Sequence, residues 1–117
     1  EMCIRDRAIA AACHNYFFME FTPGQGEPFR MLKKGDVWFT AVMLRGFIEL
    51  YQVDGNKVYL DSFARSLDYA WTHAREDNGL FNTDFTGKSR DNRKWLLTQA
   101  AMVEMYARLA VFANQSL

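Results

Sequence analysis

The chain has 117 residues, enough for one domain with a sizeable core and too few for two. Its 14 basic and 14 acidic residues are mixed along the sequence, which argues against nucleic acid or an anionic membrane as partner, because both bind a concentrated positive field. The two cysteines match no metal or redox spacing, and no apolar run approaches the roughly 18 residues of a membrane span.

Residues 1–7 carry no clear pattern, and we interpret them as an artefactual leader preceding a domain at 8–117. The alanine-rich run from Ala8 to about Phe18 favours a helix and is interpreted as the end of a longer one. The stretch 22–34 contains both prolines of the chain and two glycines, so it is predicted to be a loop.

The next stretch predicts a helix over about 37–53. Asp36 can accept the unpaired N–H groups of a first helical turn, and Gly55 can adopt the left-handed conformation that ends a helix. Apolar residues between them cover most of the helix circumference. A helix that is apolar nearly all round must be buried nearly all round, so we expect an inner helix.

Two further helices are predicted, at about 57–75 and 94–112. The first is apolar along one side and polar along the other, which indicates an outer helix. The second is apolar almost all round, which indicates another inner helix. Between them, turn residues at 77–79 and 86–87 fit either a short β-hairpin or an ordered loop.

The order outer, inner, outer, inner predicts an all-α fold of about four helices, packed antiparallel in sequence order. The two inner helices begin about sixty residues apart, too far for tetratricopeptide or ankyrin repeats. This spacing is typical of a toroid of paired helices, of which the chain would form a part.

Several motifs resemble the C-terminal half of family 76 glycoside hydrolases, over about residues 8–110. They are Trp38-Phe39 with Arg45, Tyr59-Leu60, and the stretches 70–75, 78–81, 84–87 and 96–103. The resemblance implies an (α/α)6 toroid, endo-α-1,6-mannanase activity in the full-length protein, and a secreted, periplasmic or cell-surface location. It also implies an α-mannan substrate, a monomer when full length, and no cofactor.

The sequence departs from the family pattern at two places. Thr40-Ala41 stand where the family commonly has Lys-Gly after Trp-Phe, and Phe85 stands where it often has Trp before x-Gly. Both changes affect the expected details of the sugar subsites and of linkage specificity. They leave the expected fold unchanged.

A third departure concerns catalysis. The family's catalytic pair is two adjacent aspartates on an earlier part of the toroid, and no two adjacent aspartates occur in this sequence. Glycoside hydrolysis needs two carboxyl groups flanking the scissile bond. Glu76-Asp77 is the nearest substitute, but a solvated helix end is the favoured interpretation. We therefore expect a fragment without catalytic residues, inactive alone.

Ligands of α/α toroids usually lie where inner helices begin, which predicts five substrate-binding residues: Asp36, Trp38, Arg93, Lys94 and Trp95. Asp84, in the predicted hairpin, is a sixth candidate because it could reach a sugar hydroxyl. Each has a competing structural role. Asp36 is favoured as a helix cap and Asp84 as a turn cap. Trp38 suits stacking on a sugar ring and filling the core equally, whereas Trp95 favours the core.

The other polar residues inside the predicted helices are given structural roles. Arg45 lies more than two turns into its helix with Glu49 one turn later, which favours a buried ion pair. His14 and His73 have no partners at metal-ligand spacing, so neither a metal site nor a cofactor is predicted.

Two other classes of protein remain open. One is a different (α/α)6 carbohydrate enzyme, such as an unsaturated glucuronyl hydrolase or a sugar epimerase. It would be expected to carry catalytic His or acidic residues at the helix ends. The other is a non-enzymatic helical interaction module, which would be expected to form a self-contained fold with capped ends.

Overall fold

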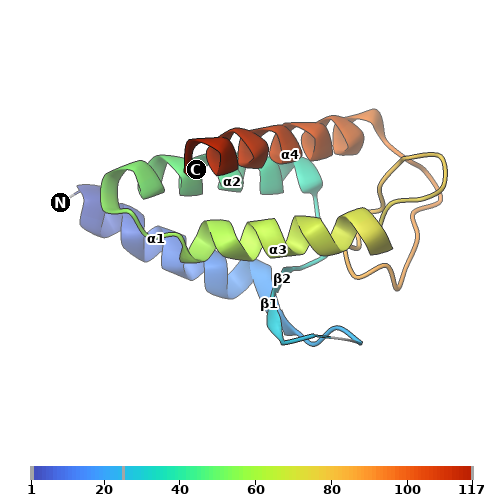
Figure 1. Cartoon of the computed structure of the whole chain (residues 1–117), viewed down its shortest axis with the longest axis horizontal. Helices are drawn as coiled ribbons and strands as arrows, with labels where there is room; N and C mark the ends of the chain where they lie inside the picture. Colours follow the sequence, from blue (N-terminus) through green and yellow to red (C-terminus); the bar gives the residue numbers. More distant parts are fainter. Residues whose placement is uncertain (1, 25, 117) are drawn as a thin grey trace.

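The computed structural model describes the backbone of residues 2–24 and 26–116, and the side chains of residues 5–24 and 26–112. These residues form helices and one small antiparallel sheet (Figure 1). In chain order the elements are α1 (Met2–Phe17), β1 (Phe18–Phe21), β2 (Phe29–Leu32), α2 (Val37–Asp54), α3 (Val58–His73) and α4 (Leu96–Ser116).

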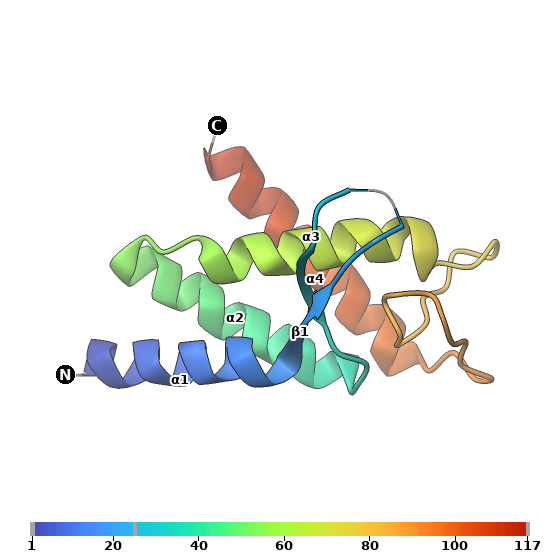
Figure 2. The same cartoon turned by 90° about the horizontal axis from the view of Figure 1, so that it is seen from below.

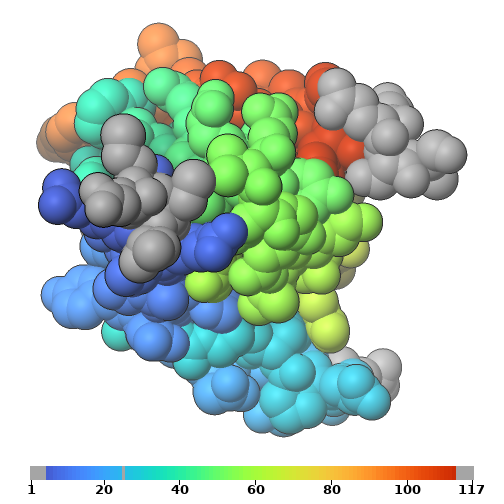
Figure 3. Space-filling view, turned by 90° about the vertical axis from the view of Figure 1, so that its left-hand side faces the viewer, coloured from blue at the N-terminus to red at the C-terminus, as the bar shows by residue number. Residues whose placement is uncertain are grey.

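Successive helices run in opposite directions, as the sequence predicts (Figures 1 and 2). Helix α2 lies at the centre and packs against α1, α3 and α4. Because α2 and α4 run the same way, both begin at the end of the molecule that carries the long loop 74–95. Figure 3 shows the other end, where the α2–α3 turn lies between α1 on one side and α4 on the other.

The bounds of α2 follow from its two predicted caps. The Asp36 carboxylate accepts the backbone N–H of Trp38 at 3.1 Å, which satisfies one of the unpaired donors of the first turn. Gly55 has φ of 71°, and its N–H donates to the Tyr51 carbonyl at 2.8 Å. Only a residue without a Cβ adopts that left-handed conformation at little cost, so the helix ends there.

The all-α prediction missed the hairpin of β1 and β2, where we expected a helix end and a loop. Phe18 pairs with Leu32 and Phe21 with Phe29. Arg30 ends α1, because its guanidinium donates to the carbonyls of His14 and Phe18 at 2.8 and 3.0 Å. The fold is therefore mostly helical with one two-stranded sheet.

The hairpin is fixed to α3 by a buried hydroxyl. Ser66 is fully buried, accepts the backbone N–H of Leu32 at 3.1 Å, and donates to the Ser62 carbonyl at 2.8 Å. Around it, Phe18 meets Phe63 edge-on with ring centroids 5.4 Å apart. The strand pairing is thus supported by a contact with Ser66, which lies 34 positions after Leu32 in the sequence.

The expected contrast between inner and outer helices was wrong for burial. Helix α3, expected to be outer, buries Leu60, Ser62, Phe63, Ser66, Leu67 and Ala70. Helix α4, expected to be inner, buries three of its described residues: Ala101, Met102 and Met105. Burial needs a neighbour as well as an apolar residue, and α2 is the helix that packs most extensively on α4.

Helix α1 begins at Met2 and continues across residue 8, where we placed the end of an artefactual leader. Arg7, inside that leader, lies 3.4 Å from the Asp54 carboxylate at the end of α2. The structure therefore shows no break at residue 8, and the leader assignment stays a prediction. No described helix is both long and apolar enough to cross a membrane.

The predicted partner of Arg45 was wrong. Its guanidinium donates to both carboxylate oxygens of Glu104 on α4, at 2.6 and 3.0 Å, and Arg108 donates to the same carboxylate at 3.0 Å. Arg45 pairs with Glu104 rather than with Glu49, one turn later in its own helix, because its side chain faces α4. The hydrogen bonds from Arg45 and then Arg108 lower the pKa of Glu104 to about 2.

This lowered pKa predicts a loss of stability in acid. The Glu104 carboxylate stabilises the fold fully above its ordinary pKa of 4.5, and this contribution disappears as the pH falls through about 2. Because the side chains are partly exposed, we expect a contribution under about 1 kcal/mol. Urea unfolding between pH 7 and pH 2 should show a shallower pH dependence for Glu104→Gln than for the unaltered chain; identical slopes would contradict this.

Candidate functional site

A cleft of about 480 Å³ lies where α2 and α4 begin, beside the loop 74–95; we call it the loop cleft. Its lining residues come from the two helix starts and the loop between α3 and α4: Asp36, Thr83, Arg90, Asp91, Asn92, Arg93, Lys94, Trp95, Leu97, Thr98 and Gln99. Four of the six predicted substrate-binding residues are among them. The other two, Trp38 and Asp84, lie outside this lining.

Two tryptophans are exposed near these helix starts. Trp95 is 66% exposed and directly precedes α4, and Trp38 is 47% exposed in the first turn of α2. Neither side chain fills the core, which was the favoured interpretation for Trp95 and one of two for Trp38. An exposed indole presents a flat apolar face with one N–H donor, the combination that binding surfaces use.

Asp84 is occupied within its own loop. One carboxylate oxygen accepts the N–H and hydroxyl of Thr86 at 3.0 and 2.6 Å, and the other accepts both donors of Ser89 at 3.2 and 3.0 Å. Burial alone would raise the pKa of Asp84, but these hydrogen bonds outweigh it and lower the pKa. The turn-capping role favoured from the sequence therefore accounts for this carboxylate.

A second set of hydrogen bonds joins Asp91, which lines the loop cleft, to other residues of the loop. Asp91 accepts the backbone N–H and the hydroxyl of Thr83 at 2.8 and 3.0 Å, and its own N–H donates to the side-chain carbonyl of Asn82 at 2.9 Å. Asn82 is buried and donates to the Ala74 carbonyl at the end of α3. The loop is thereby tied to the helix that precedes it.

The loop is also tied to the helix that follows it. The side-chain amide of Gln99 accepts the Phe81 N–H at 2.8 Å and donates to the Phe81 carbonyl at 2.9 Å. Lys94 donates to the Asp91 carbonyl at 2.6 Å and to the Glu76 carboxylate at 2.8 Å. Lys94 lines the cleft, yet its ammonium makes both of these contacts within the loop.

Sequence reasoning missed Asn82, Asp91, Gln99 and the role of Glu76. Gln99 gave one signal, as a polar residue that interrupts an apolar helical run. Asn82 and Asp91 gave no signal beyond their turn-forming type. Their partners are set by how the loop folds, which no local periodicity reports.

The loop cleft offers binding groups but no pair of free carboxylates. Of the two carboxylates in its lining, Asp36 caps α2 and Asp91 binds Thr83. Acid–base cleavage of a glycosidic bond needs two carboxyl groups placed on either side of that bond. Both carboxylates in the described lining of the cleft thus already accept hydrogen bonds from the protein.

The two histidines have partners outside the loop cleft. His14 Nε2 lies 2.8 Å from the Ser62 hydroxyl, and burial followed by the charge of Arg30 lowers its pKa. His73 stacks on Tyr69 with ring centroids 3.8 Å apart. Among the described residues, no group of three or more His, Cys, Asp or Glu side chains is placed to hold a metal ion.

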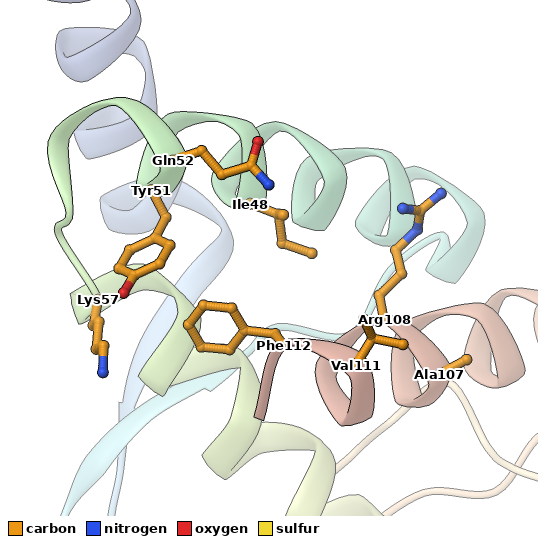
Figure 4. Close-up of a pocket in the computed structure, with 8 residues that line it drawn as sticks. All are labelled: Ile48, Tyr51, Gln52, Lys57, Ala107, Arg108, Val111 and Phe112. Carbon is orange, nitrogen blue, oxygen red and sulfur yellow. The ribbon is translucent and has the colours of Figure 1, made fainter. Parts of the chain in front are cut away.

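A second hollow, of about 510 Å³, lies between the C-terminal halves of α2 and α4 (Figure 4). Tyr51 and Phe112 meet edge-on at one end of it, with ring centroids 5.0 Å apart, and Arg108 lies at the other. None of the six predicted substrate-binding residues lines it. The predicted residues therefore gather at the opposite end of these helices.

No family model matches the sequence, and no curated protein matches it. Two solved structures are similar to it. One is a family 76 glycoside hydrolase from a bovine Bacteroides thetaiotaomicron strain, 36% identical with a TM-score of 0.87, over 92% of this chain and 23% of that chain. The other is a family 76 glycoside hydrolase (mannosidase) from Bacteroides thetaiotaomicron VPI-5482, also 36% identical with a TM-score of 0.87, over 95% of this chain and 30% of that chain.

Both similar proteins are family 76 glycoside hydrolases, and this chain is similar to part of each of them in fold and in sequence. The predicted resemblance to glycoside hydrolase family 76 is confirmed. The chain spans 23% and 30% of the two proteins that it matches.

Proposed function

We propose that this chain is the C-terminal part of a family 76 glycoside hydrolase, and that its loop cleft contributes to binding α-1,6-linked mannan. The observation that carries this proposal is the pair of exposed indoles, Trp38 and Trp95, beside a polar cleft at two helix starts. The similarity to two family 76 enzymes supports the class of substrate. Asp36, Arg93 and Trp95 are the cleft residues proposed to face it.

The proposed full-length protein is an (α/α)6 toroid in which α2 and α4 belong to the inner ring, and α1 and α3 to the outer ring. The alternating helix directions and the parallel course of α2 and α4 support this arrangement. An adjacent aspartate pair elsewhere in that protein would supply the acid and the nucleophile or base. We propose that the full-length protein is monomeric and works outside the cytoplasm.

The two alternative classes gain no support from the comparisons. A glucuronyl hydrolase or sugar epimerase shares the toroid, but both similar structures are family 76 glycoside hydrolases. An interaction module was expected to form a self-contained fold with capped ends, and neither similar structure is of that kind. Mannan binding is therefore the function that we propose to test.

Binding can be tested with α-1,6-mannotriose titrated into the chain by calorimetry. We expect Trp95→Ala and Trp38→Ala each to weaken binding by about tenfold, equivalent to roughly 1.4 kcal/mol. Trp71→Ala is the matched control, because Trp71 is 50% exposed but lies on α3 under the guanidinium of Arg75. Equal losses from all three changes, or no binding by the unaltered chain, would contradict the proposal.

We expect no hydrolysis of α-1,6-mannan by this chain alone, because its sequence lacks the adjacent aspartate pair. Reducing ends released from mannan should stay at the level of a buffer blank over a day. Glu76→Ala with Asp77→Ala is the informative variant if turnover appears. Turnover by the unaltered chain that this double change abolishes even at saturating mannan would show that the chain carries its own catalytic carboxylates.

A further inference from the structure

Lys94 was predicted to bind substrate, but its surroundings indicate a different role. Its side chain is 14% exposed, and its ammonium lies 2.8 Å from the Glu76 carboxylate and 2.6 Å from the Asp91 carbonyl. An ammonium has three protons to donate, and two of them are directed at these acceptors. To bind this ammonium, a ligand in the loop cleft would have to compete with the Glu76 carboxylate and the Asp91 carbonyl, both of which accept charge-assisted hydrogen bonds from it.

The two partners of this ion pair belong to different ends of the loop. Glu76 follows the end of α3 at His73, and Lys94 precedes the start of α4 at Leu96. The hydrogen bond from Lys94, followed by that from Asn82, lowers the pKa of Glu76. Glu76 is therefore ionised in the neutral range, and the pair joins the exit of one helix to the entry of the next.

The residues on either side of Lys94 are those proposed to face the ligand. Trp95 follows it directly and is 66% exposed, so packing contributes little to holding that indole in place. Arg93 precedes it, is exposed, and lines the loop cleft. Lys94 ties this short segment to the rest of the loop, since its ammonium binds both Glu76 and Asp91.

We infer that Lys94 is a positioning residue: with Glu76 it fixes the segment 93–95 so that Trp95 is presented to a ligand in the loop cleft, and it does not contact that ligand itself. This inference rests on the proposed mannan binding for its ligand. It extends that proposal by naming Glu76, three residues beyond the end of α3, as part of the binding machinery.

The inference is tested by titrating α-1,6-mannotriose into Lys94→Met, Glu76→Gln and the double variant of the 117-residue chain. We expect each single change to weaken binding three- to tenfold, and the double change to weaken it no more than either single change. Arg108→Met is the control, because it removes a cation that also pairs with a glutamate on α4 but lies outside the loop cleft. Its affinity should equal that of the unaltered chain.

A loss of binding in Lys94→Met without a loss in Glu76→Gln would overturn the inference, since it would mean direct contact between Lys94 and the ligand. Unchanged binding in both variants would show that the ion pair is structural alone. Hydrogen exchange by mass spectrometry gives a readout that needs no ligand. The amides of residues 93–95 should exchange at least fivefold faster in both single variants, and unchanged exchange would overturn the positioning role even if mannotriose does not bind.

Discussion

Gly87→Ala is expected to lower the free energy of unfolding by roughly 3 kcal/mol or more, through backbone strain and a steric clash. Gly87 has φ of 78°, a conformation that costs an alanine energy wherever it occurs. An added Cβ would also lie 2.3 Å from the His73 carbonyl oxygen and 3.1 Å from its carbon. These are backbone atoms at the end of α3, so the loop would have to move away.

Gly79→Ala is the matched control for this prediction. Gly79 also has a positive φ, 88°, but a Cβ there would meet no other atom within 4 Å. Its replacement should cost only the conformational term, about 1 kcal/mol. Urea unfolding of both variants separates the two terms, and equal midpoints would show that the loop does not press against α3. We also expect Gly87→Ala to weaken mannotriose binding, because the displaced loop forms one side of the loop cleft.

The parts of the fold that depend on residues close together in the sequence were predictable from the sequence. The start of α2 follows from an aspartate that can reach the N–H two residues later, and its end follows from a glycine. The amphipathic pattern of α3 gave its buried face, including Leu60, Phe63 and Leu67. These signals lie within one helix and need no knowledge of the rest of the molecule.

The hairpin was not predictable in the same way. Proline and glycine in the stretch 22–34 indicated a loop, and the alanine-rich run indicated a helix as far as Phe18. The strands are stabilised by two hydrogen bonds to distant residues. Arg30 donates to the Phe18 carbonyl just after α1, and Ser66 accepts the backbone N–H of Leu32. Both contacts join residues at least twelve positions apart, so their energy does not appear in any local pattern.

Sequence reasoning grouped several residues that the structure places around one cleft, but it did not reveal the hydrogen bonds among them. The rule that ligands lie where inner helices begin selected Asp36, Arg93, Lys94 and Trp95, which all line the loop cleft. It gave no means of knowing that Lys94 would bind Glu76 across the loop. Whether a polar residue in a cleft is available to a ligand depends on the partners it already has.

The uneven burial of α4 leads to the second large effect, self-association of the isolated chain. An apolar row along α4, here called the α4 stripe, lies on its exposed side: Leu96, Ala100, Val103, Ala107 and Val111. A groove of about 480 Å³ between α1 and α2 exposes a second apolar surface, lined by residues including Ile9, Phe39, Val42 and Val53. Contiguous exposed apolar surfaces of this kind mark sites of interaction or aggregation.

The total accessible surface points the same way. It is 7654 Å², whereas a compact monomer of 13.6 kDa exposes roughly 6,600 Å². Burying apolar surface stabilises a fold by about 25 cal/mol per Å², so leaving a few hundred Å² exposed loses on the order of 5–10 kcal/mol of that stabilisation. That is comparable to the whole net stability of an ordinary domain.

We therefore expect the 117-residue chain to sediment as dimers or larger species at micromolar concentration, and to unfold over a broad temperature range. Val103→Glu with Val111→Glu should shift it toward the monomer, because the α4 stripe would then carry two charges. Val58→Glu is the matched control, since Val58 is 56% exposed, as Val111 is, but lies at the start of α3. If the unaltered chain is a monodisperse monomer with a sharp unfolding transition, then the α4 stripe and the groove between α1 and α2 do not drive association, and the prediction is wrong.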